Sequence, residues 1–160
     1  MKLGVIADTH SRDIPRQVLE EFKKMDFIIH AGDFCSPDDL RKLAKINEVK
    51  AVYGNMDESA LRKRLPRRDV IEWQGFKIGL FHGDGAPQKL LDLVKSEFKS
   101  DELDVIIFGH SHHPMNEKIG DTLFFNPGSP NDLVIAPFCS YGVLEVENKQ
   151  IVGKIIKIKG

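Results

Sequence analysis

Short apolar runs alternate with segments of helical periodicity in the first third of the chain. Val18 and Phe22 lie at the spacing of one helix face in the first segment, as do Leu40 and Leu43 in the second. The apolar runs have the length of buried strands. This strand–helix–strand–helix–strand order favours parallel strands joined by helical crossovers. The expected strands cover residues 2–7, 27–31 and 49–53.

The second half of the chain has a more mixed pattern. Gln74-Gly75 and Gly120-Asp121 are typical of tight turns and separate pairs of short strand-like runs. The mixture indicates an α/β fold with two sheets and helices outside them. The lack of a linker or repeat predicts a single domain over residues 1–160. Strands are expected at residues 69–73, 76–81, 105–108, 115–119, 122–125, 141–147 and 151–158, and helices at 58–64 and 87–98.

Composition and charge narrow the class of protein. The chain has 160 residues, a net charge of −1 and a charged share of 29%, which is ordinary for a globular protein without an overall attraction to nucleic acid or membrane. No apolar run reaches membrane-spanning length, and the N-terminus is too short for a signal peptide. Cys35 and Cys139 cannot form a disulfide framework, so we expect a reduced, cytoplasmic protein. Both thiols are expected to be inert, with Cys35 serving in packing.

Five of the predicted strands end on polar side chains that can bind metals. Ligand sites in parallel sheets lie beyond the carboxyl ends of the strands. Oxygen and imidazole ligands without thiolates exclude a structural zinc site of the cysteine type. Seven ligands are too many for one tetrahedral ion, but suit two ions of higher coordination that share a carboxylate. The candidates are Asp8, His10, Asp33, Asn55, His82, His110 and His112.

These strand ends carry a family resemblance. In their order along the chain they resemble the five blocks of the calcineurin-like metallophosphoesterases, and most of all the compact prokaryotic phosphodiesterase branch. That branch is related to the phosphoesterase-fold subunit of the eukaryotic retromer. The blocks are Asp8-Thr9-His10, Gly32-Asp33, Gly54-Asn55-Met56-Asp57, His82-Gly83 and Gly109-His110-Ser111-His112, and Asn126-Pro127-Gly128-Ser129 follows them.

The resemblance implies a fold, a cofactor and ligand roles. The fold would be a four-layer α-β-β-α sandwich of two mixed sheets, with two divalent cations at the strand ends. Manganese is the expected ion, with nickel, cobalt, iron or zinc as alternatives. Asp33 would bridge the two cations. One cation would take Asp8, His10 and His112 besides Asp33, and the other Asn55, His82 and His110.

The implied reaction is hydrolysis of a phosphodiester. Two cations that share a water lower its pKa toward neutrality, and the resulting hydroxide attacks phosphorus. Asn55, His110 and Asp33 would be the residues closest to this chemistry, with Asn55 facing the phosphate. The expected substrate is a small phosphodiester.

One position departs from the family pattern. The larger family has a histidine in the third block where this chain has Met56, which cannot protonate a leaving group. We therefore expect a preference for good leaving groups, with water or His113 supplying the proton. Asp57 is expected to orient a histidine or a loop amide. His30, inside a strand, is expected to be a core or supporting residue rather than a ligand.

The sequence is also compatible with other functions. A non-catalytic scaffold on the same fold, as in the retromer subunit, is the main alternative, although it would not need all seven ligands. A nucleic-acid phosphoesterase is less favoured because the net charge is close to zero. Edge strands in a small domain are compatible with a homodimer. A basic cluster is expected to form a solvated face, with steering of an anionic substrate as the alternative. It comprises Arg62, Lys63, Arg64, Arg67 and Arg68.

Overall fold

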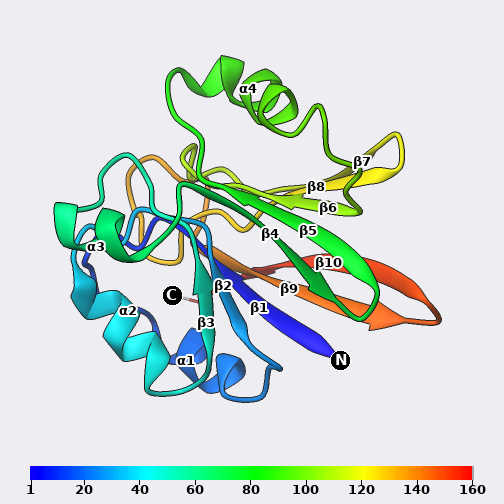
Figure 1. The fold of residues 1–160 in the computed structure, drawn as a ribbon. Helices are drawn as coiled ribbons and strands as arrows, with labels where there is room; N and C mark the ends of the chain where they lie inside the picture. Colours follow the sequence, from blue (N-terminus) through cyan, green and yellow to red (C-terminus); the bar gives the residue numbers. More distant parts are fainter. Residues whose placement is uncertain (160) are drawn as a thin grey trace.

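Two five-stranded sheets pack face to face in the structure, a computed structural model that describes residues 1–159 (Figure 1). The first has the strand order β10-β9-β1-β2-β3 and the second β4-β5-β6-β8-β7. The first contains β1 (Lys2–Ile6), β2 (Ile28–His30), β3 (Val49–Ala51), β9 (Ser140–Glu147) and β10 (Gln150–Lys157). The second contains β4 (Arg68–Trp73), β5 (Phe76–Phe81), β6 (Val105–Ile107), β7 (Met115–Ile119) and β8 (Thr122–Asn126).

Helices cover the outer faces of both sheets, which gives four layers (Figure 1). Val18 and Phe22 of α1 and Leu43 of α2 pack on the first sheet, whereas Leu90 and Val94 of α4 pack on the second. This arrangement confirms the predicted α-β-β-α sandwich. The helices are α1 (Arg16–Phe22), α2 (Pro37–Ala44), α3 (Ser59–Arg64) and α4 (Leu90–Glu97), the last preceded by the 3₁₀ turn η1 (Pro87–Lys89). None of the helices within residues 1–159 combines the length and apolarity needed to cross a membrane.

Strand residues alternate between the centre of the sandwich and its outer layers. Leu3 and Val5 of β1 are fully buried between the sheets, while Ile6 belongs to the cluster under α1. Val105 and Ile107 of β6 likewise face the centre. Strands buried on both faces therefore appear in the sequence as continuous apolar runs, as observed at residues 2–7 and 105–108.

The topology brings the carboxyl ends of six strands to one edge of the sandwich. β1, β2 and β3 are parallel to one another in the first sheet, and β5, β6 and β8 are parallel in the second. Several strands end one or two residues earlier than predicted: β1 ends at Ile6 and β2 at His30. The next backbone groups continue the hydrogen bonding into the loops, from Ala31 N to Ile6 O and from Asp8 N to Gly32 O. The loops that follow these strands form the site.

Candidate metal centre

The backbone of the strand-end loops is left-handed at most of the predicted ligands. The φ angle is 56° at Asp8, 48° at His10, 61° at Asp33, 72° at His110 and 60° at His112. Each such non-glycine residue costs on the order of 1–3 kcal/mol unless its surroundings compensate, and such strain concentrates at functional sites. The chain thus accepts strain at the residues whose side chains meet at the edge of the sandwich.

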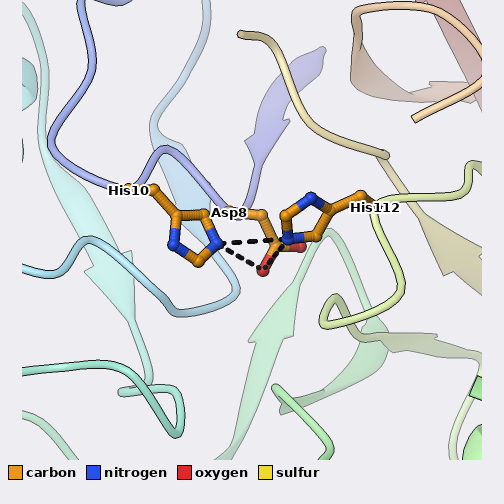
Figure 2. Close-up of side chains that lie close together, drawn as sticks. All are labelled: Asp8, His10 and His112. Carbon is orange, nitrogen blue, oxygen red and sulfur yellow. Dashed lines mark hydrogen bonds and ion pairs between the residues drawn. The ribbon is translucent and has the colours of Figure 1, made fainter. Parts of the chain in front are cut away.

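Asp8, His10 and His112 form the first group of side chains (Figure 2). The Nε2 atoms of His10 and His112 lie 3.1 Å apart. Asp8 Oδ1 lies 3.7 Å from His10 Nε2 and 3.5 Å from His112 Nε2. Asp8 is fully buried and its Oδ2 accepts a hydrogen bond from the His110 amide at 3.0 Å, which leaves Oδ1 directed at the two histidines.

Asp33, His82 and His110 form the second group. His82 Nε2 lies 3.1 Å from Asp33 Oδ2, and the rings of His82 and His110 lie edge to face with centroids 5.6 Å apart. His82 and Asp33 are both buried, whereas His110 is half-buried. The structure therefore gathers six of the seven predicted ligands into two adjacent sets.

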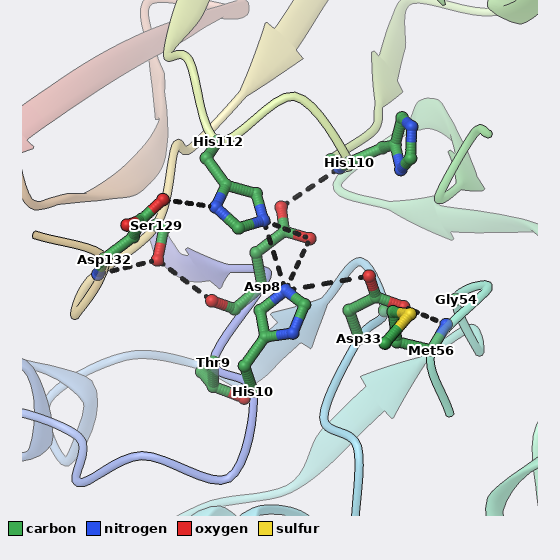
Figure 3. Close-up of polar contacts among 12 residues, drawn as sticks. Asp8, Thr9, His10, Asp33, Gly54, Met56, His110, His112, Ser129 and Asp132 are labelled. Atoms are coloured by element: carbon green, nitrogen blue, oxygen red, sulfur yellow. Dashed lines mark hydrogen bonds and ion pairs between the residues drawn. The ribbon is translucent and has the colours of Figure 1, made fainter. Parts of the chain in front are cut away.

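Two carboxylates connect the groups. Asp33 Oδ2 lies 3.1 Å from His82 Nε2 in its own group. The same oxygen lies 3.7 Å from His10 Nε2 in the other group (Figure 3). Asp8 Oδ1 in turn lies 3.6 Å from His82 Nε2. Asp33 thus has the position expected of a bridging carboxylate.

Each of the four histidines is anchored through its other ring nitrogen. His112 Nδ1 binds Asp132 Oδ2 at 2.5 Å, and His82 Nδ1 binds the Ala31 carbonyl at 2.7 Å. The other two contacts are His110 Nε2 to Gly85 O at 2.7 Å and His10 Nδ1 to Cys35 Sγ at 3.3 Å. Carbonyls and carboxylates only accept hydrogen bonds, so His82, His110 and His112 donate outward and keep a lone pair for the centre.

Two polar atoms that face the centre have no hydrogen-bond partner within residues 1–159. Asp8 Oδ1 and His82 Nε2 are buried without a hydrogen bond in the described residues. An unpaired buried polar atom is costly, and a cation at the centre would give both Asp8 Oδ1 and His82 Nε2 a partner. Imidazole nitrogens and carboxylate oxygens are also ligands of choice for divalent transition metals. The residues present therefore fit the two divalent cations that the family resemblance implies.

The pKa shifts within the centre also favour bound positive charge. Burial opposes protonation of His82, but the charges of Asp8 and Asp33 outweigh it and raise its pKa to about 9. The contact with Asp8 raises the pKa of His10 against a smaller effect of burial. Burial opposes ionisation of Asp33, yet the close approach of the His82 ring, its charge and the Met56 amide lower the pKa of this carboxyl. The site is strongly anionic and attracts positive charge, whether protons or metal cations.

The loop after β3 holds Asn55, Met56 and Asp57 beside the second group. Asn55 is exposed and, together with His82, lines a small pocket. The buried Asp57 carboxylate accepts amide hydrogen bonds from Asp33 at 3.0 Å, Cys35 at 2.7 Å and Gly54 at 2.7 Å. Asp57 therefore orients loop amides, as expected. The Met56 amide donates to Asp33 Oδ1 at 2.8 Å (Figure 3).

His30 and His113 lie outside the two groups. His30 is buried behind them, where Nε2 lies 3.1 Å from Thr9 Oγ1 and Nδ1 accepts a hydrogen bond from the Gly32 amide. Burial lowers its pKa well below the usual value, so the ring is neutral. His113 is exposed, and its Nδ1 contacts the Ser111 carbonyl at 2.8 Å.

Several residues that support the site were not singled out from the sequence. Asp132 anchors His112 from a loop 20 residues away, where no periodic pattern indicated a role. Ser129 Oγ donates to the Asp8 carbonyl at 2.9 Å, and Asn126 Nδ2 donates to the Gly109 carbonyl at 3.0 Å. Ser129 and Asn126 both belong to Asn126-Pro127-Gly128-Ser129, the segment that follows the five blocks of the family resemblance. Burial raises the pKa of the Cys35 thiol to about 11, in keeping with the expected inert residue, and its Sγ also lies 3.3 Å from His10 Nδ1.

Comparison with known proteins gives consistent results. The model of the calcineurin-like phosphoesterase superfamily domain matches residues 1–149. A probable metallophosphoesterase of Methanocaldococcus jannaschii is 38% identical over 99% of this chain and 82% of its own length. The structure of a novel archaeal phosphodiesterase aligns with a TM-score of 0.80 and 26% identity, over 98% of this chain and 100% of that one. Zinc-bound Vps29 of Entamoeba histolytica aligns with a TM-score of 0.74 and 25% identity, over 98% and 99%.

Proposed function

Because the chain belongs to the calcineurin-like phosphoesterase superfamily, we propose that it is a phosphodiesterase that uses two divalent metal cations. The observation that supports this most is the paired arrangement of Asp8, His10 and His112 beside Asp33, His82 and His110. Anchored imidazoles with inward lone pairs are typical of preformed metal sites. The phosphodiesterase of similar fold, 26% identical over 98% of this chain, supports a diester as the substrate class.

The ligand roles follow the two groups. Asp8, His10 and His112 would hold one cation and His82, His110 and Asn55 the other, with Asp33 shared between them. Manganese is the proposed ion, with nickel, cobalt, iron and zinc as alternatives. When bound, two such cations supply a water of lowered pKa as nucleophile and positive charge for the phosphate oxygens.

This chain's own residues position the substrate. Asn55 is exposed at the rim of the second group, where its amide is free to donate to a phosphate oxygen. Met56, 58% exposed, presents no proton donor at the position where larger family members have a histidine. His113 is exposed one residue beyond His112, within reach of solvent, and is the candidate proton donor together with water. We therefore propose that good leaving groups, such as aryl alcohols, are favoured.

The test is metal reconstitution. Metal-stripped protein receives Mn²⁺, Ni²⁺, Co²⁺, Mg²⁺ or Zn²⁺ in turn, and release of p-nitrophenol from bis(p-nitrophenyl) phosphate is measured. We expect Mn²⁺ to restore hydrolysis, and we expect Asp8→Asn to abolish it. Asp121→Asn, in the exposed turn between β7 and β8, is the matched control that should remain active.

A scaffold role is the second candidate. The similarity to Vps29 across 98% of this chain and the methionine at position 56 are the observations that favour it. If calorimetry shows that the cations bind and yet no diester is hydrolysed with any of them, the enzymatic proposal is wrong and the scaffold interpretation replaces it.

A further inference from the structure

A small pocket adjoins the second group of ligands and extends away from it toward α3. Its volume is about 170 Å³, and its walls include Tyr53, Asn55, Arg62, Arg67, His82 and Asp84. Pockets for whole drug-sized ligands measure roughly 300–1,000 Å³. This pocket therefore has room for one substituent of a molecule whose reacting group lies at the metal centre.

Two hydrogen bonds and an aromatic contact position the Arg62 guanidinium at this pocket. Its Nη2 donates to the Asn55 carbonyl at 2.8 Å and its Nε to the Asp57 carbonyl at 3.0 Å. The guanidinium carbon lies 5.2 Å from the centre of the Tyr53 ring, so an aromatic face supports the planar group. Fixing the side chain in advance reduces the entropy that a ligand would otherwise have to overcome.

The charge of Arg62 is not neutralised by the protein. Both of its hydrogen bonds go to carbonyl oxygens, and within residues 1–159 no carboxylate forms an ion pair with it. A guanidinium has five N–H donors, so donors remain for another acceptor. Arg62 is exposed, as a solvated basic face requires, and its remaining donors are also available to an anionic substrate.

The second arginine of the pocket differs from the first. Arg67 makes a bidentate ion pair with Glu97, at 2.7 and 3.1 Å, and its guanidinium lies over the Phe81 ring at 4.7 Å. Asp84 is close enough to Arg67 to raise its pKa further. The negative charges of Glu97 and Asp84 offset the positive charge of Arg67. Arg62 therefore carries the uncompensated positive charge among the residues that line this pocket.

We propose that this pocket is an anion subsite in which Arg62 binds a second phosphate group of the substrate. This proposal rests on the proposed function, because the subsite would bind a substituent of the phosphodiester that is hydrolysed at the metal centre. The substrate class becomes a small phosphodiester that carries a further phosphate, with the diester at the metal centre and the second phosphate on the Arg62 guanidinium. Arginine binds phosphate through charge-assisted, often bidentate hydrogen bonds, which a single exposed lysine does not reproduce.

The first experiment tests the subsite without metals and without catalysis. Inorganic phosphate is titrated into the full chain in EDTA, and the NMR signals of the Arg62 Nε–H and the Tyr53 and Gly54 amides are followed. We expect saturable shifts at these groups. Arg62→Gln should weaken binding by about tenfold, because it removes charge-assisted hydrogen bonds, whereas Arg64→Gln on the same helix should leave it unchanged.

Arg62 also supports a loop, so its variants need a check on structure. Arg62→Lys keeps the charge and should retain part of the phosphate affinity, and the amide spectra should show the fold intact in every variant. The proposal is overturned if the shifts appear only around His10 and His112. It is also overturned if Arg62→Gln and Arg64→Gln weaken binding equally, which would indicate non-specific attraction by surface charge.

The second experiment connects the subsite to the reaction. Thymidine 5′-(p-nitrophenyl phosphate) is compared with the same diester bearing a 3′-phosphate, in the Mn²⁺-loaded protein. We expect the 3′-phosphate to raise kcat/KM about tenfold in the wild type and in Arg64→Gln, and to give no advantage in Arg62→Gln. If the ratio of kcat/KM for the two diesters is the same in all three proteins, the subsite plays no part in substrate recognition. Lack of hydrolysis of either compound, with phosphate still bound at Arg62 in EDTA, would refute the proposed function and leave the anion site standing.

Discussion

Asp33 contacts both groups of candidate ligands, through His82 Nε2 at 3.1 Å and His10 Nε2 at 3.7 Å. We expect Asp33→Asn to weaken binding of both Mn²⁺ ions by more than about tenfold, because loss of a direct ligand costs more than loss of its outer partner. His10→Ala should affect mainly one ion. Isothermal titration calorimetry counts the ions and gives their affinities. Two ions bound at full affinity in Asp33→Asn would contradict a bridging role.

Among the described residues 1–159, Asp132 is the one carboxylate that anchors a candidate ligand histidine through its outer nitrogen. Burial opposes ionisation of Asp132, but His112 and the amides of Val134 and Ile135 hold its pKa far below the usual value. Asp132 is therefore anionic and accepts the hydrogen bond from His112 Nδ1. Asp132→Asn should lower the affinity of one cation by about 10–100-fold, since the ring loses its orienting charge. Calorimetry with Mn²⁺ measures this change. Asp121→Asn serves as the control, and an equal loss in both variants would exclude a specific role for Asp132.

At the scale of elements, the segment from β3 to α3 controls how closely two loops approach. A Cβ atom on Gly54 would overlap the Asp33 carboxylate and lie 2.6 Å from the Asp33 amide nitrogen. Neither group can retreat easily, because Asp33 N donates to Asp57 and Asp33 Oδ1 accepts from Met56. Glycine is therefore required here for its small size.

We expect Gly54→Ala to displace Asp33 and so to reduce both metal binding and diester hydrolysis. Overpacking should also lower the free energy of unfolding by about 1–3 kcal/mol. Gly75→Ala is the control, because Gly75 has a positive φ of 82° and open space around it in the turn between β4 and β5. That variant should lose some stability but bind cations normally. Normal binding in Gly54→Ala as well would show that the loops can separate without harm.

The elements also show where sequence reasoning succeeds and where it stops. Asp8, Asp33 and His82 were predictable as site residues because each directly follows an apolar run that becomes a buried parallel strand. Asp132 was not, since its contact with His112 depends on the path of an irregular loop. The interaction of Arg62 with two carbonyls was likewise invisible in a run of basic residues. The left-handed backbone at Asp8 and Asp33 is only weakly marked by residue type, because aspartate adopts it more often than most residues but far less often than glycine.

At the scale of the whole molecule, one buried carboxylate lies on the outer side of the first sheet. Asp39, in the first turn of α2, is only 1% exposed, and neither of its oxygens has a hydrogen-bond partner of normal length within residues 1–159. Burial raises the pKa of Asp39, and the nearby Thr9 hydroxyl and Ser11 amide lower it only in part. The folded state therefore binds a proton at Asp39 more tightly than the unfolded state does.

This difference sets the sign of a pH effect on stability. Below about pH 4 the group is protonated in both states and has no charge to bury. As the pH rises through the folded pKa, the penalty for a buried carboxylate develops fully. Asp39→Asn should thus raise the free energy of unfolding at about pH 7 by about 1–3 kcal/mol, the usual cost of an unpaired buried polar group, and the gain should vanish near pH 4. Urea unfolding in EDTA at both pH values measures it.

The neighbouring acid provides a matched control for this last prediction. Asp38 is exposed and paired with Arg41 at 2.9 Å, so Asp38→Asn should change stability by less than about 0.5 kcal/mol at either pH. If Asp39→Asn is instead destabilising at about pH 7, Thr9 and Ser11 bind the carboxylate strongly enough to outweigh its burial. The carboxylate would then tie α2 to the loop that carries Asp8 and His10, and the fold would depend on its charge instead of tolerating it.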